Sequence, residues 1–293
     1  MRRRDFITLV GGSAVWPIGV GAQQAMPVIG YLGSENSDRY ATRLTAFRQG
    51  LGAMGFDEGR NVAIEFVWAD GQPDRLPALA ADLVRRRVTV IAAPGSAAAG
   101  LAAKAATTTI PVVFETGLDP VQAGLVKSLN RPEGNVTGVT SLNSAVTPKG
   151  LELLASIGVT IEVLTANTNS EIDAAFESLA QKHVDALVVS PDNLFSNRRV
   201  QLITLSSRHA VPTIYSFRED VEAGGLMSYG ADIPGEYRDV GIYVGRILKG
   251  EKPAELPVVQ PTKFEFVVNQ QTAKTLGLRI PPALLTAADK VIE

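Results

Sequence analysis

VTVIAAPGSAAAGLAAKAATTTIPVVFETGLDP, residues 88–120, is the stretch that decides the fold class of this chain. Its first apolar run, 88–93, ends in Pro-Gly-Ser, and an Ala-rich segment with the composition of a helix follows. A second apolar run, 110–114, ends in Glu-Thr-Gly. Strand, loop of small residues, helix and strand in this order predict a parallel α/β sheet.

The same alternation continues through two halves of the chain with no long linker between them. It predicts two α/β lobes, each a mostly parallel sheet flanked by helices, with a cleft between them. A late helix and a late strand indicate that the chain crosses between the lobes more than once. We expect lobe 1 to contain 27–138 plus 231–255, and lobe 2 to contain 139–230 plus 256–293. Further predicted strands are 27–34, 61–68, 135–140, 161–165, 186–190, 212–215, 226–229 and 263–268. Further predicted helices are 39–54, 76–87, 121–129, 149–155, 171–182, 197–209, 237–248 and 272–276.

The composition narrows the possible functions. The 293-residue chain contains no cysteine and only two histidines, His183 and His209. Disulfides, thiolate catalysis and Cys-based zinc sites are therefore excluded, and a histidine-rich metal site is not expected. Aromatic residues are few and no basic patch stands out, so nucleic-acid binding is not expected. The sequence contains no dinucleotide fingerprint, P-loop or G-x-S-x-G elbow, so we expect no enzyme, no catalytic residue and no cofactor.

The N-terminus has the three-part pattern of a secretory signal peptide. Residues 1–6 are basic, residues 7–20 are apolar and rich in small side chains, and Val-Gly-Ala at 20–22 offers a cleavage site. Arg3-Arg4-x-Phe6 is also typical of a twin-arginine export signal. A short membrane anchor is the alternative. We expect cleavage near Ala22 and a periplasmic protein.

Motifs near the C-terminus make the chain similar to a known family. They are GGLMSYG at 224–230, YVGRILKG at 243–250 and LPVVQPTKFE at 256–265. With the export signal and Gly-Tyr-Leu-Gly at 30–33, they resemble the ABC-transporter substrate-binding proteins of the tryptophan/tyrosine-binding class. The resemblance implies a type I periplasmic binding protein fold. It also implies delivery of a small organic solute, an aromatic amino acid or similar carboxylate, to a membrane permease. We expect a monomer that closes its hinge around the solute, or alternatively a sensor module that reports the solute to a receptor.

The chain departs from this family pattern in its second half. In the family, a strand, a loop that faces the ligand and a helix separate the segments that correspond to 150–155 and 161–165. Only 156–160 lie between them here. One βα unit of the second lobe is therefore predicted to be missing, which would leave the neighbouring strand at a sheet edge.

Ligands of parallel sheets bind beyond the carboxyl ends of the strands, so we expect the site residues there. Gly95 and Ser96 lie just before a predicted helix, whose N-terminus suits a carboxylate. Asp119 and Asp192 suit an ammonium group, whereas Phe217, Trp68 and Tyr31 could supply an apolar wall. The alternatives are helix capping for Ser96 and Asp192, a turn for Asp119 and a core position for Tyr31. The complete predicted set is Ser34, Trp68, Gly95, Ser96, Thr116, Asp119, Thr140, Asp192, Ser216 and Phe217.

Overall fold

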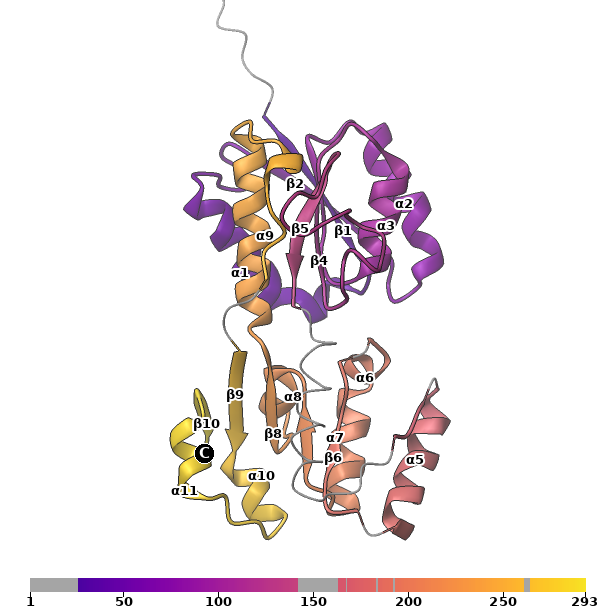
Figure 1. Cartoon of the computed structure of the whole chain (residues 1–293), viewed down its shortest axis with the longest axis vertical. Helices are drawn as coiled ribbons and strands as arrows, with labels where there is room; N and C mark the ends of the chain where they lie inside the picture. Colours follow the sequence, from indigo (N-terminus) through magenta and orange to yellow (C-terminus); the bar gives the residue numbers. More distant parts are fainter. Residues whose placement is uncertain (1–25, 142–162, 167, 183, 192, 261–263) are drawn as a thin grey trace, which may run out of the picture.

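The computed structural model describes residues 26–141, 163–166, 168–182, 184–191, 193–260 and 264–293. Within these residues the chain forms two five-stranded sheets, which belong to two lobes stacked along the long axis of the molecule (Figure 1). Their strand orders are β2-β1-β3-β4-β5 and β10-β9-β8-β7-β6. The predicted α/β fold with two lobes is confirmed.

The first lobe contains a sheet that is parallel throughout. Its strands are β1 (Val28–Gly33), β2 (Ala63–Trp68), β3 (Val90–Ala93), β4 (Val112–Thr116) and β5 (Val136–Thr140). Its helices are α1 (Ala41–Ala53), α2 (Leu76–Arg85), α3 (Ala97–Ala106) and α9 (Ile233–Leu248), with short 3-10 helices η1 (Ser37–Tyr40), η2 (Pro73–Arg75) and η3 (Pro253–Glu255). β3, β4 and β5 are buried along their whole length, which explains why they read as continuous apolar or small-residue runs.

The second lobe contains a mixed sheet, in which only the β8–β9 pair is antiparallel. Its strands are β6 (Leu187–Val188), β7 (Thr213–Tyr215), β8 (Met227–Ala231), β9 (Phe264–Asn269) and β10 (Lys290–Ile292). Its helices are α5 (Asn169–Lys182), α6 (Asn193–Asn197), α7 (Arg199–Arg208), α8 (Arg218–Glu222), α10 (Gln270–Thr275) and α11 (Pro282–Ala287).

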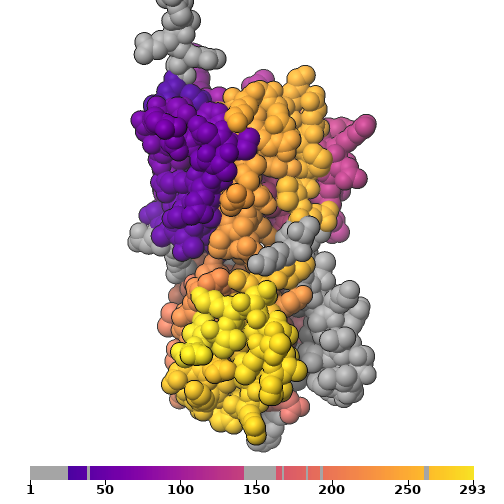
Figure 2. Space-filling view, turned by 90° about the vertical axis from the view of Figure 1, so that its left-hand side faces the viewer, coloured from indigo at the N-terminus to yellow at the C-terminus, as the bar shows by residue number. Residues whose placement is uncertain are grey.

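Helix α9 joins the two halves of the sequence in one core. It follows β8 of the second sheet but packs beside α1 in the first lobe, as its orange ribbon shows (Figure 1). The space-filling view likewise shows orange segments beside the indigo N-terminal ones, whereas the yellow C-terminal residues lie on the other lobe (Figure 2). Tyr237, Val240 and Val244 of α9 are fully buried in a cluster with Phe47 and Leu51 of α1. The core of the first lobe therefore depends on a helix that comes late in the sequence.

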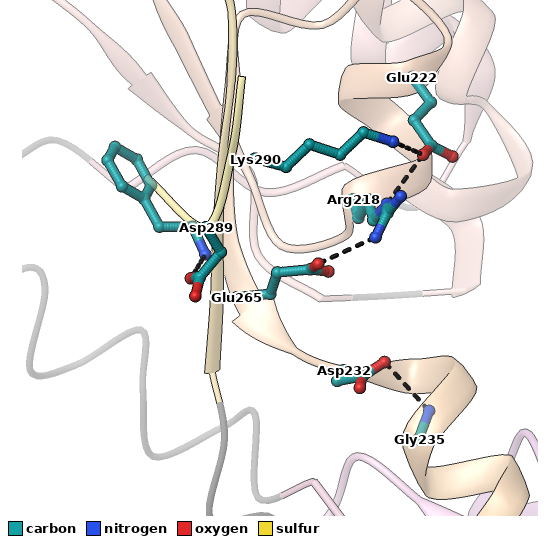
Figure 3. A network of polar contacts seen from close by, with 8 residues as sticks. Arg218, Glu222, Asp232, Gly235, Glu265, Asp289 and Lys290 are labelled. Carbon is teal, nitrogen blue, oxygen red and sulfur yellow. Dashed lines mark hydrogen bonds and ion pairs between the residues drawn. The ribbon is translucent and has the colours of Figure 1, made fainter. Parts of the chain in front are cut away.

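The chain crosses between the sheets three times: after β5, between β8 and α9, and between η3 and β9. Asp232 begins α9 immediately after the second crossing, where its Oδ1 accepts the amide of Gly235 at 3.0 Å (Figure 3). Residues 256–259 run along β5, because Val259 donates its amide to the carbonyl of Gly138 at 3.0 Å. The sequence predicts that lobe 1 ends at 138, inside β5, and that 256–259 belong to lobe 2. The contacts between 256–259 and β5 therefore lie a few residues beyond the predicted boundaries.

Two predicted elements are wrong in their described parts. Residues 121–129, predicted as a helix, form turns. One turn begins after Asp119, and the chain leaves it at Gly124, whose φ is +76°. Residues 163–165, the described part of the strand predicted over 161–165, form no strand, and the helix predicted over 149–155 lies outside the described residues.

The second sheet ends at β6, which in the described part of the chain pairs only with β7. Beside β6 lies a cavity of about 90 Å³ between this strand, α5 and residues 164–166. Its lining is mostly apolar and includes Phe176, Leu187 and Leu202.

Candidate functional site

The candidate site lies at the carboxyl edge of the first sheet. Because the strands are parallel, the residues that end β1, β3, β4 and β5 all lie at this one edge. The second lobe meets it there. Phe217, which follows β7, packs against the core of the first lobe, and Asn197 Nδ2 donates to Glu35 Oε1 at 3.3 Å. Arg43 Nη2 also lies 3.6 Å from Glu219 Oε1. Residues of both lobes therefore converge on the predicted edge.

Aromatic rings from four elements, β1, η1, β2 and α9, form one cluster beside this edge. Trp68, at the end of β2, lies with its ring centroid 5.4 Å from that of Tyr31 and 5.5 Å from that of Tyr40. Tyr40 in turn lies 5.9 Å from Tyr237 of α9. Tyr31 is fully buried, which favours the core alternative for this residue, whereas Trp68 is only half-buried. Arg43 lies over the rings of Tyr40 and Tyr237, at 5.0 and 5.6 Å from their centroids.

Gly95 lies where the tyrosines, the sheet edge and helix α3 meet. Its φ is +97°, and a Cβ there would lie 2.6 Å from Tyr40 Oη and 2.9 Å from Tyr237 Oη. No larger residue fits without moving both rings. The Gly95 amide donates to Glu115 Oε2 at 2.9 Å. This amide is therefore already used by a carboxylate of the protein itself.

Ser96 is the N-cap of α3, because its Oγ accepts the amide of Ala99 at 3.1 Å. We expect Ser96→Ala to lower the free energy of unfolding by about 1 kcal/mol, since an orphan helix amide loses its acceptor. Urea unfolding of the purified protein measures this change. Ser96→Asp keeps an acceptor at the N-cap, so equal losses in both variants would contradict the capping role.

Thr116, Asp119 and Thr140 hold the loop that follows β4. Thr116 Oγ1 accepts the amide of Leu118 at 3.1 Å, and Thr140 Oγ1 donates to its carbonyl at 2.9 Å. Asp119 Oδ1 accepts the amide of Val121 at 2.8 Å, as the turn alternative predicts. The side chain of Leu118 between them is 55% exposed. The three predicted site residues thus come together, with local hydrogen bonds that shape one loop.

The structure describes two of the three site residues that were predicted in the second lobe. Ser216 Oγ donates to the carbonyl of Val189 at 2.9 Å and so ties β7 to the end of β6. Phe217 precedes α8 and contacts the first lobe. Asp192 lies outside the described residues.

Two carboxyl groups, Glu115 of β4 and Glu236 of α9, are buried next to each other behind Gly95. Burial, and after it the charge of the neighbouring Glu115, raise the pKa of Glu236 to about 10. Burial also raises the pKa of Glu115, although Arg43 and the Gly95 amide oppose this. Neither Glu236 oxygen has a hydrogen-bond partner of good geometry among the described residues, so Glu115 acts on it mainly through its charge. At neutral pH Glu236 is therefore protonated.

Other buried polar atoms at this edge also lack a hydrogen-bond partner in the described part of the structure. They are Ser34 Oγ at the end of β1, Ser141 Oγ after β5, and the hydroxyls of Tyr31 and Tyr237. Buried polar groups in proteins are normally paired, by the protein, by water or by a ligand. Among these, only Ser34 and Tyr31 were singled out from the sequence. Ser141 follows Thr140 at a predicted strand end, and this position could have pointed to it. Glu236 and Tyr237 carry no sequence signal, because their place depends on how α9 returns to the first lobe.

The arrangement offers hydroxyls, carboxyls and one guanidinium around aromatic rings, which suits binding of a polar organic molecule. Among the described residues no three His, Asp or Glu side chains lie close enough together to hold a metal ion. In the same residues no helix is both long and apolar enough to cross a membrane.

Residues 35–157 and 143–292 each match the family described as ABC transporter substrate binding protein. The chain belongs to this family. The two matched segments of this substrate-binding protein overlap at 143–157, next to the region in which a βα unit is predicted to be missing.

Similarities to individual proteins support this family assignment. A tyrosine-binding protein of Clostridioides difficile (strain R20291) is 27% identical over 267 residues, which cover 80% of this chain and 76% of the relative. A conserved domain protein from Vibrio cholerae and an ABC domain from Streptococcus pneumoniae in complex with L-Trp each share 25% identity and a TM-score of 0.80 with this substrate-binding protein. Each comparison covers 91% of this chain and 99% of the solved one. The predicted type I periplasmic binding protein fold is confirmed.

Proposed function

We propose that this chain is the extracytoplasmic solute-binding component of an ABC importer and that it binds an aromatic amino acid in the cleft between its lobes. The observation that carries the proposal is the edge of the first sheet, where aromatic rings surround buried polar atoms that have no partner in the described protein. The relatives add the ligand class, because one is a tyrosine-binding protein and another was solved with L-Trp.

Hinge closure is part of this proposal. The three crossings between the sheets are the segments about which the lobes would rotate, as in binding proteins that close around a ligand. The contacts between Asn197 and Glu35 and between Glu219 and Arg43 join the lobes near the cleft. A bound solute would add contacts to both lobes and so favour the closed arrangement.

The partner and the compartment follow from the same proposal. The N-terminal signal pattern directs the protein to the periplasm, where a closed binding protein would deliver its solute to the membrane permease of the importer. We expect the protein to act as a monomer and without a cofactor.

A thermal-shift experiment tests the proposed ligand. A ligand present at about a hundred times its Kd adds roughly 2.7 kcal/mol to the free energy of unfolding. For a protein of this size we expect L-Trp, L-Tyr or L-Phe to raise the Tm by roughly 5–10 °C. Sugars and aliphatic amino acids, at the same concentration, serve as the comparison. A cooperative melt that responds to a sugar and to no amino acid would contradict the proposal.

A further inference from the structure

Arg43, at the boundary between the lobes, has fewer hydrogen-bond partners than a buried guanidinium requires. Its side chain is only 18% exposed, and it donates no hydrogen bond to any residue that the structure describes. A guanidinium has five N–H donors and is always charged, so burial without acceptors is costly. The contacts of Arg43 are the faces of Tyr40 and Tyr237 and the carboxylate of Glu219 at 3.6 Å, which is longer than a hydrogen bond.

The surroundings keep Arg43 charged. Burial alone would lower its pKa, but Tyr237, Tyr40 and the carboxylates of Glu219 and Glu115 raise the pKa overall. The guanidinium of Arg43 is therefore a charged hydrogen-bond donor. The hydroxyl of Tyr237 beneath it is buried and has no partner in the described residues.

Glu219 faces Arg43 from the other lobe, and its side chain is 25% exposed. Its position is fixed by the preceding residue of α8, Arg218. Arg218 Nε donates to Glu222 Oε1 at 2.8 Å, and Arg218 Nη1 donates to Glu265 Oε1 of β9 at 2.9 Å (Figure 3). Lys290 of β10 donates to the same Glu222 oxygen at 3.1 Å. These bonds hold the short helix against β9 and β10 and so fix the direction from which Glu219 approaches the cleft.

We propose that Arg43 and Glu219 recognise the two charges of a zwitterionic amino acid, with Arg43 binding its carboxylate and Glu219 its ammonium group. This inference rests on the proposed function and names the residues that select the ligand class. The guanidinium of Arg43 and the carboxylate of Glu219 face each other across the proposed cleft without a direct hydrogen bond. The carboxylate of a zwitterion supplies an acceptor to Arg43, and its ammonium group supplies a donor to Glu219. Binding then links the two lobes through one ligand.

Of the groups that the sequence suggested for these tasks, those that the structure describes are already occupied. The Gly95 amide is bonded to Glu115, and the Ser96 hydroxyl caps α3. Both oxygens of Asp119 accept local bonds, Oδ1 from the Val121 amide and Oδ2 from Gln122 Nε2 at 3.2 Å. The Arg43–Glu219 pair has no such local partner in the described residues.

The test compares ligands that lack one charge. Calorimetric titration of the purified protein would use L-Trp, tryptamine, which has no carboxylate, and 3-indolepropionate, which has no ammonium group. We expect Arg43→Gln to weaken L-Trp binding by about tenfold to a hundredfold, the effect of one lost charge-assisted contact, and to leave tryptamine binding unchanged. Glu219→Gln should weaken L-Trp binding similarly and leave 3-indolepropionate binding unchanged.

Variants away from the proposed pair control for folding. Arg48 lies on α1 and pairs with Glu58, and Glu177 is exposed on α5 of the second lobe, so Arg48→Gln and Glu177→Gln change charge without touching Arg43, Glu219 or α8. Both should bind L-Trp like the wild type. The melting temperature of each variant shows that it is folded before its affinity is compared.

The outcomes separate this inference from the proposed function. Unchanged L-Trp affinity in Arg43→Gln or Glu219→Gln overturns the inference and leaves the aromatic ligand standing. If the wild type instead binds a non-aromatic amino acid, and both variants lose it, the inference stands and the aromatic assignment fails. If the wild type binds none of the proteinogenic amino acids, both fail.

Discussion

Gly50→Ala is expected to lower the free energy of unfolding by about 3 kcal/mol, which is a large share of the stability of a typical protein. Gly50 lies on the buried face of α1, and a Cβ there would overlap the carbonyl oxygen of Arg238 on α9. Gly241 of α9 has the reciprocal relation to the carbonyl of Phe47 on α1. The two helices touch backbone to backbone, so an added methyl group must push them apart and open the core between them.

Gly52→Ala, two residues further along the same helix, is the matched control. Gly52 is exposed, and its Cβ would have Asp57 Oδ1 as a neighbour at 3.8 Å, which is an ordinary contact. This change should stabilise the protein by about 0.5–1 kcal/mol, because alanine loses less backbone entropy in a helix. Urea unfolding followed by circular dichroism measures both variants. Similar behaviour of the two variants would contradict the close helix contact.

Glu236→Gln is expected to flatten the dependence of stability on pH. In the folded protein the pKa of Glu236 is raised to about 10 from an ordinary value of 4.5, first by burial and then by Glu115. Between these two values the folded state holds a proton that the unfolded state has released. Stability therefore falls as pH rises through this window, by up to about 1.4 kcal/mol per pH unit from this one group. Glutamine keeps the shape of the protonated carboxyl and removes the titration.

Urea unfolding at several pH values from 6 to 9 measures this effect. We expect the wild type to lose stability steeply over the range and Glu236→Gln to lose less, so that the variant is the more stable protein at the alkaline end. Glu255→Gln, on an exposed residue of the same lobe, should run parallel to the wild type. Parallel curves for Glu236→Gln and the wild type would mean that Glu236 does not hold a proton in the folded state.

The fold could be predicted from the sequence wherever a strand and its crossover helix follow each other directly. Residues 88–120 give β3, α3 and β4 close to the expected bounds, because burial on both faces makes such strands continuous apolar runs. The prediction failed at 121–129, where helical composition is overruled by a turn that ends at Gly124. It also failed at 163–165, where a strand-like sequence forms no strand.

The candidate site could be predicted only as an edge of the sheet. Strand ends are visible in the sequence, so Ser34, Gly95 and Thr140 were found at the expected edge. Arg43 was not found, because on α1 it reads as one more polar residue of an amphipathic helix. Its meaning depends on Glu219, which comes from the other lobe and is far away in the sequence. Contacts of this kind are set by tertiary structure alone.

The return of α9 to the first lobe has a consequence for synthesis. All five strands of the first sheet are complete by Thr140, but the face of that sheet that packs with α1 is completed by a helix that ends at Leu248. A growing chain therefore leaves the apolar side of α1 uncovered while the ribosome makes β6, β7 and β8 of the second lobe. Although multidomain chains generally fold from the N-terminus, the N-terminal lobe cannot complete its core until these three strands of the other lobe have been made.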